Sequence, residues 1–167
     1  MATKLDLANL ARAEALKTWH GKLVGLKSNL QPIVRLFPKW SLKEADGLWC
    51  AAFVYYCCVQ AGYEIPVRPK ECASCSLAGC GGWDEWAKKD NRIGWRSASC
   101  TPLPGDIVLY DKVFENKLHD HMGIVLEDRG DFILAAEGNL GNVSGIVERP
   151  KDGHIRGYIS LPDHFVY

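Results

Sequence analysis

The stretch GLWCAAFVYYCCVQAG, residues 47–62, carries three of the seven cysteines of the chain. Residues 48–59 are apolar on every side of any helix drawn through them, which predicts a fully buried helix. Cys50 stands at the start of this helix, where unpaired backbone N–H groups and the helix dipole favour an anion. Cys57 and Cys58 lie two turns further in and are predicted to be core residues. Cys50 is therefore the candidate nucleophile.

A nucleophilic cysteine needs an imidazole base and a polar group that orients the base. Five histidines are available. His121 opens the strand-like run HMGIVLE, and Gly123, two residues on and on the same face, leaves room for a helix start to approach. His119 lies in the charged stretch ENKLHDH, where exposure is expected. His121 is thus the candidate base.

The run FILAAEGN, residues 132–139, ends with two polar residues, Glu137 and Asn139. Side chains two positions apart in a strand point to the same side. Either residue can accept the imidazole N–H and fix its tautomer. The plainer interpretation is that EGN forms only a turn.

The elements that must position these residues are helices first and strands afterwards. Residues 3–20 have apolar positions at three- to four-residue spacing, which predicts an amphipathic helix ended by Gly21. Shorter helical pieces are predicted within 23–36 and around 83–89. Strand-like runs follow at 106–110, 121–126, 131–136, 146–147 and 157–160. This order indicates an α+β fold, in which the buried helix packs on one face of an antiparallel meander.

Composition limits the class of protein. A chain of 167 residues that is 47% hydrophobic suits one ordinary domain. Twenty basic and twenty acidic residues cancel, so neither nucleic acid nor a membrane is expected as a partner. The N-terminal stretch lacks the apolar core of a secretory signal peptide, and no run approaches a membrane span. We therefore expect synthesis in the cytoplasm, where an odd number of cysteines suits free thiols.

Four segments together resemble a known family. WCAAFVYYCCVQAG, PGDIVLYD, HMGIV and EGNLGN occur in this order with compatible gaps, from about Gly47 to Tyr158. The combination closely resembles the CHAP (cysteine, histidine-dependent amidohydrolase/peptidase) domains and, more broadly, the NlpC-like papain-fold hydrolases of bacterial cell walls. The resemblance implies a papain-like fold and a single catalytic domain, 1–167, with a helical N-terminal part, 1–45, and a CHAP-like core, 47–160.

The resemblance also implies roles for the residues at matching positions. In the family, the cysteine after the tryptophan is the nucleophile, the histidine of the H-x-G-I-V strand is the base, and an acidic or amide residue on the next strand orients it. Here these are Cys50, His121 and Glu137, with Asn139 as a further polar member. The implied activity is hydrolysis of peptidoglycan or a peptide through a thioester acyl-enzyme, by an N-acetylmuramoyl-L-alanine amidase or an endopeptidase. We expect a monomer that needs no cofactor.

Two features found in many relatives are not seen in this sequence. Some relatives have an Asp-rich calcium loop before the nucleophile, whereas SLKEADG offers only Glu44 and Asp46, so no metal is expected there. Many relatives also have a signal peptide or a wall-binding module. The expected site of action is the cell wall after release or secretion, as for a phage lysin or a delivered toxin. A bacterial cytosolic peptidase or transferase with a non-wall substrate is the alternative.

A second alternative uses the remaining cysteines. The segment CASCSLAGC has a C-x2-C pair and a third thiol close by, namely Cys72, Cys75 and Cys80. Cys100 or His119 could complete four ligands for a structural zinc ion. On this hypothesis the protein is a zinc-stabilised interaction module.

Overall fold

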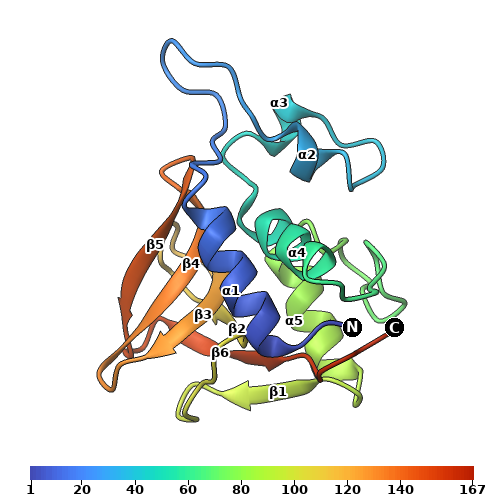
Figure 1. Ribbon diagram of the computed structural model, residues 1–167, viewed down its shortest axis with the longest axis vertical. Helices are drawn as coiled ribbons and strands as arrows, with labels where there is room; N and C mark the ends of the chain where they lie inside the picture. Colours follow the sequence, from blue (N-terminus) through green and yellow to red (C-terminus); the bar gives the residue numbers. More distant parts are fainter.

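The computed structural model describes all 167 residues, in five helices and six strands. The elements are α1 Lys4–Ala15, α2 Gln31–Val34, α3 Leu42–Ala45, α4 Cys50–Gln60, α5 Cys80–Lys89, β1 Gly94–Ser97, β2 Ile107–Tyr110, β3 His121–Asp128, β4 Phe132–Leu140, β5 Val143–Pro150 and β6 Ile155–Ser160. Helices α1 and α4 pack on one face of the sheet, and α5 lies beside α4 (Figure 1). The predicted α+β arrangement, with the buried helix on an antiparallel sheet, is confirmed.

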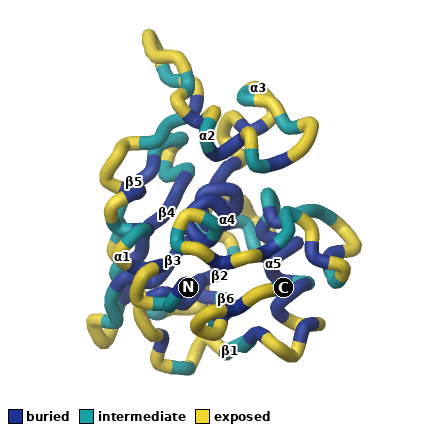
Figure 2. The backbone as a smooth tube through the Cα atoms, turned by 45° about the vertical axis from the view of Figure 1, so that its right-hand side comes forward, coloured by how far each residue is buried: buried dark blue, intermediate teal, exposed yellow.

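Helix α4 lies at the centre of the core. Every residue from Cys50 to Cys58 is buried, and the tube of Figure 2 is largely dark along this helix. The helix ends two residues before Gly62, whose φ of 98° lies in the left-handed region that favours glycine. The surrounding cluster of 38 buried residues draws on α1, α5 and the sheet. Packing on all sides therefore fixes where α4 begins, and with it the position of Cys50.

Helix α1 is shorter than predicted. It ends at Ala15, whereas the apolar spacing continues to His20. Beyond the helix, Thr18 has a φ of 51°, and the backbone N–H of Trp19 donates to Ser144 Oγ at 2.9 Å. The helix ends early because the following residues form hydrogen bonds with β5, and the local apolar spacing does not predict these bonds.

The other predicted helices also differ at their ends. Within 23–36 only Gln31–Val34 is helical, with a proline in its first turn. Helix α5 begins at Cys80, three residues before the predicted start at Trp83. None of the helices in the structure has the length and apolar character that crossing a membrane requires.

The six strands form one antiparallel sheet in the order β1-β6-β2-β3-β4-β5. Strands β2 to β5 form the predicted meander. The prediction that the meander continues to the last strand is wrong, because β6 returns to pair with β2. Strand β1 was not predicted, and it pairs with β6 at the edge of the sheet. All four residues of β2 are buried. Strand β6 covers the side of β2 that would otherwise be an open apolar edge.

The alternation of side chains along β2 divides the interior into two clusters. Ile107 and Leu109 belong to the main core on the helix-covered side, while Val108 and Tyr110 belong to a smaller cluster of 6 buried residues on the other face. Tyr110 pairs with His121, the first residue of β3. The candidate base therefore begins a central strand, between β2 and β4.

Candidate active site

His121 and Glu137 meet across the neighbouring strands β3 and β4. The imidazole Nε2 donates to Glu137 Oε2 at 2.6 Å, and both side chains are fully buried. A Cβ atom on Gly123 would lie 2.6 Å from Glu137 Cγ, which is closer than atoms can approach. The glycine does leave the room that the sequence indicated, but the group that fills it is the Glu137 side chain rather than a helix start.

Arg149 of β5 binds the same carboxylate through two hydrogen bonds. Its Nε donates to Glu137 Oε1 at 3.0 Å and its Nη2 to Oε2 at 2.7 Å. Burial raises the pKa of Glu137, but the hydrogen bonds and charges of His121 and Arg149 lower that pKa below its ordinary value. The carboxylate is therefore ionised and fixed in orientation. The sequence pattern assigned Arg149 no role, because only the pairing of β4 with β5 brings it to Glu137.

Cys50 is the first residue of α4, as predicted, and its thiol borders a groove. A hydrogen bond with Cys80, whose Sγ lies 3.7 Å from Cys50 Sγ, opposes the effect of burial on the Cys50 pKa. The imidazole of His121 and the backbone N–H of Ala51 act in the same direction, and the pKa of Cys50 falls to about 5. No side chain caps the start of α4, so its first N–H groups remain available to an anion.

The second ring nitrogen of His121 completes the arrangement. Nδ1 is buried and has no hydrogen-bond partner. Cys50 and His121 each shift the pKa of the other, so the thiol and the imidazole are neighbours. Burial lowers the pKa of His121, but Cys50 and Glu137 outweigh it and raise that pKa to about 9. At neutral pH these shifts favour a thiolate beside an imidazolium.

Two aromatic rings hold the imidazole in place. Tyr110 stacks on His121 with ring centroids 5.7 Å apart, and Phe114 meets the ring edge-on at 4.5 Å. Phe114 belongs to the loop 111–120 between β2 and β3 and is half exposed. The loop therefore covers the imidazole, and of Cys50, His121 and Glu137 it is Cys50 that borders the groove.

Asn139 lies apart from the imidazole. Its φ is 60°, and the register of β4 against β5 shifts between Glu137 and Leu140. The strand alternation that would place Asn139 beside Glu137 is interrupted at this point. Its Nδ2 donates to the carbonyl of Gly47 at 2.8 Å, and it makes no hydrogen bond with His121. The structure thus brings Asn139 to the loop before Cys50 and not to the base.

Asn142 binds the same loop more extensively. Its Oδ1 accepts from the backbone N–H of Gly47 at 3.1 Å and from Trp49 Nε1 at 2.8 Å. Its Nδ2 donates to Asp46 Oδ1 at 2.7 Å and to a backbone carbonyl at 3.2 Å. Asn142 is the last residue of the segment EGNLGN, and the sequence pattern assigned it no role. In the structure it fixes the approach to the first residue of α4.

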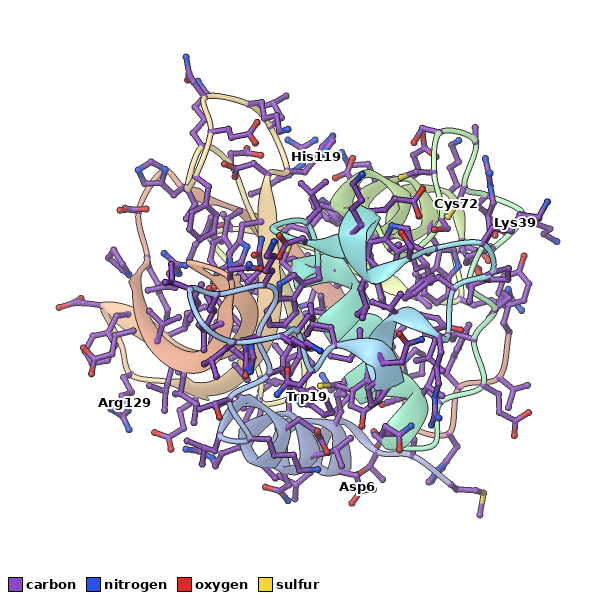
Figure 3. All side chains as sticks on the ribbon, turned by 90° about the horizontal axis from the view of Figure 1, so that it is seen from above. Asp6, Trp19, Lys39, Cys72, His119 and Arg129 are labelled. Carbon is purple, nitrogen blue, oxygen red and sulfur yellow. The ribbon has the colours of Figure 1, made fainter.

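The groove beside Cys50 has a volume of about 710 Å³. Its lining includes the apolar side chains of Leu48, Phe114 and Leu118, all largely exposed. His119, expected to be exposed, is half-buried in this lining, and its Cε1 lies near the start of α5 (Figure 3). The groove therefore runs between the starts of α4 and α5 and the loop 111–120.

The thiols considered as zinc ligands do not converge. Cys72 Sγ donates to the carbonyl of Gly82 at 3.2 Å, while Cys80 faces Cys50. Cys72 stands well apart from His119 in Figure 3. No three His, Cys, Asp or Glu side chains come together in a way that could hold a metal ion. The zinc-module alternative therefore has no ligand set in this fold.

A helix-borne thiol beside a histidine of an antiparallel sheet places the protein in the papain-like class of folds. The family model of the CHAP domain matches residues 43–139. The chain therefore belongs to the CHAP domain family, as the sequence motifs predicted.

One solved structure, described as "The crystal structure of Ly7917", has the same overall fold. The TM-score is 0.51 at 15% sequence identity, and the match covers 95% of this chain. The chain spans 61% of the length of that structure. No curated protein matches the sequence. The likeness to the solved structure is thus one of fold.

Proposed function

We propose that the protein is a cysteine hydrolase that cleaves an amide or peptide bond of peptidoglycan, with Cys50 as nucleophile, His121 as acid and base, and Glu137 as the residue that orients the imidazole. The observation that carries the proposal is a series of hydrogen-bonded side chains. It runs from Arg149 through Glu137 to His121 and leads to a thiol that opens on the groove. Membership of the CHAP family supports the substrate class.

The acylation step follows from the ionisation of the pair. The Cys50 thiolate attacks the carbonyl carbon, and the backbone N–H groups at the start of α4 are positioned to donate to the developing oxyanion. The imidazolium of His121 gives its Nδ1 proton to the leaving amine, the C–N bond breaks, and a thioester remains. Water then attacks the thioester while Nδ1 takes its proton, which releases the acid and restores the thiolate.

Glu137 contributes through the tautomer of the imidazole. Its carboxylate holds the proton on Nε2, so Nδ1 is the nitrogen that exchanges a proton with thiol, amine and water. Arg149 keeps the carboxylate ionised and in place. The groove volume of about 710 Å³ suits a short peptide, with apolar contacts from Leu48 and Leu118.

The deciding experiment is digestion of purified peptidoglycan with the wild-type protein, Cys50→Ala and Cys58→Ala, followed by mass spectrometry of the fragments. Cys58 lies on the same helix but is fully buried in the core, so its variant is the matched control. We expect wild type and Cys58→Ala to release the same new termini, and Cys50→Ala to release none. The new termini identify the bond.

Equal release by Cys50→Ala would contradict the assignment of the nucleophile. Absence of release by the wild type from every wall type tested would contradict the wall as substrate. In that second case, alkylation of Cys50 by iodoacetamide at neutral pH would still report a stabilised thiolate.

A further inference from the structure

Two thiols, not one, border the groove at the candidate active site. Cys80 Sγ lies 3.7 Å from Cys50 Sγ, and the two residues are 9% and 8% exposed. Both line the groove. In the proposed hydrolysis only Cys50 forms a covalent bond, and Cys80 contributes no more than the hydrogen bond that lowers the Cys50 pKa.

The fold holds the two sulfur atoms together from both sides. Cys50 begins α4 and Cys80 begins α5. Gly82, in the first turn of α5, packs closely on the Ser76 backbone, because a Cβ at this position would lie 2.4 Å from the Ser76 carbonyl oxygen. The packing of the two helix starts therefore keeps the sulfur atoms of Cys50 and Cys80 3.7 Å apart.

We propose that Cys50 and Cys80 are a site of reversible disulfide formation, which a peroxide drives and a thiol reductant reverses. Formation of the bond depends only on the two thiols. Its effect on activity rests on the proposed function, since a disulfide-bonded Cys50 cannot attack an amide.

The chemistry proceeds in two balanced steps. The Cys50 thiolate attacks one oxygen of hydrogen peroxide, the O–O bond breaks, and the departing hydroxide takes up a proton as water. Cys50 is oxidised by two electrons to a sulfenic acid while the peroxide is reduced. The Cys80 sulfur then attacks the Cys50 sulfur, the S–O bond breaks, and the hydroxide leaves with the Cys80 proton as a second water. A dithiol reductant returns both residues to thiols.

The five remaining cysteines are poorly placed for this reaction, and one of them, Cys100, has its Sγ 3.6 Å from the hydroxyl of Ser97. Cys57 and Cys58 are fully buried in α4, and burial raises the pKa of each. Cys72 Sγ is bound to a backbone carbonyl at 3.2 Å. Cys75 also borders the groove, but its Sγ lies 3.7 Å from the hydroxyl of Ser74 rather than beside Cys50. Cys75 is therefore the control for a thiol that shares the groove without sharing the contact.

The test treats the full chain with hydrogen peroxide and then blocks free thiols with N-ethylmaleimide. Intact mass and peptide mapping are compared for wild type, Cys80→Ser and Cys75→Ser. We expect wild type and Cys75→Ser to lose two hydrogen atoms and to yield a peptide that joins residues 50 and 80, and dithiothreitol to undo both changes. We expect Cys80→Ser to gain oxygen atoms on Cys50 that dithiothreitol does not remove after prolonged exposure.

Irreversible oxidation of Cys50 in the wild type, without a joined peptide, would overturn the proposal, and so would a link through Cys75. If Cys80→Ser fails to fold, Cys80→Ala serves in its place. The mass measurements do not require hydrolysis. A chain that forms the link but leaves peptidoglycan intact would contradict the proposed function alone, and a chain that cuts peptidoglycan but never forms the link would contradict the disulfide alone.

Discussion

Glu137 carries a charge in a place where an unpaired charge would be very costly. Its side chain is fully buried, and one oxygen, Oε2, accepts both from His121 Nε2 at 2.6 Å and from Arg149 Nη2 at 2.7 Å. Loss of one partner of a buried ion pair typically costs about 3–5 kcal/mol. The fold therefore depends on the charge of the same residue that we assign to orienting the base.

The two ionisations at the site define a pH range for activity. Cys50 must be deprotonated, which holds above its pKa of about 5, and His121 must be protonated, which holds below its pKa of about 9. The two groups titrate as a pair. We therefore expect kcat/KM to rise as the pH passes about 5 and to fall as it passes about 9.

The variant Glu137→Gln tests how one residue sets the alkaline limit of this pH range. The change removes the negative charge that favours the imidazolium, so the pKa of His121 falls and the alkaline limb of kcat/KM moves to lower pH. We also expect a loss of roughly 10²–10⁴-fold in kcat, as for a misoriented catalytic imidazole. The measurement is a full pH–rate profile on a peptidoglycan fragment.

Glu148→Gln is the matched control, because Glu148 lies in β5 but is exposed. Its profile should coincide with that of the wild type. An alkaline limb that stays in place in Glu137→Gln would refute the role assigned to this carboxylate.

At the scale of elements, the site depends on how closely β3 and β4 approach. Gly123→Ala would place a methyl group 2.6 Å from Glu137 Cγ and 2.9 Å from the Ala136 carbonyl oxygen. We expect the carboxylate to be displaced from His121, kcat to fall by about tenfold or more, and stability to fall by about 1–3 kcal/mol. Steady-state kinetics and urea unfolding measure the two effects separately.

Gly145→Ala provides the comparison. Gly145 pairs with Glu137 from β5, yet an added Cβ would approach nothing closer than Leu140 Cδ1 at 3.4 Å. We expect near-normal activity and a stability change within about 0.5 kcal/mol. Equal losses of activity in the two variants would show that the crowding at Glu137 is not the cause.

Local patterns in the sequence predicted where helices and strands form better than which of them contact each other. The apolar run from Leu48 located α4 and its first cysteine, and the alternation in HMGIVLE located β3. Strand β1 was missed because GWRS is short and only partly buried. The contacts of Arg149 with Glu137 and of Cys80 with Cys50 arise between separate elements, so no local spacing encodes them.

At the scale of the whole molecule, Asp106 connects the N-terminal helix to the sheet. Its fully buried carboxylate accepts from Lys4 Nζ of α1 at 2.8 Å and from Arg96 Nη1 of β1 at 2.9 Å. It also accepts from the backbone N–H of Leu103 at 2.8 Å. Three parts of the chain therefore meet at one side chain.

Asp106→Ala should destabilise the protein strongly. The change leaves two cations and a backbone N–H without their acceptor, and we expect the free energy of unfolding to fall by about 3 kcal/mol. Urea unfolding should show a lower midpoint with an unchanged m-value. Asp131→Ala, at an exposed turn, should behave as wild type. A midpoint shift no larger than that of the control would mean that α1 is held by apolar packing alone.

The two terminal segments contact each other, because the backbone N–H of His164 donates to the carbonyl of Ala2 at 2.6 Å. Ala2 also lies against Gly62, just past the last turn of α4. Cys50 begins that helix, so its 11 residues separate the thiol from the ends by about 16 Å. A tag, surface anchor or partner domain fused to either end would therefore stand clear of the groove. A short peptide that joined both ends would close the chain into a ring without obstructing it.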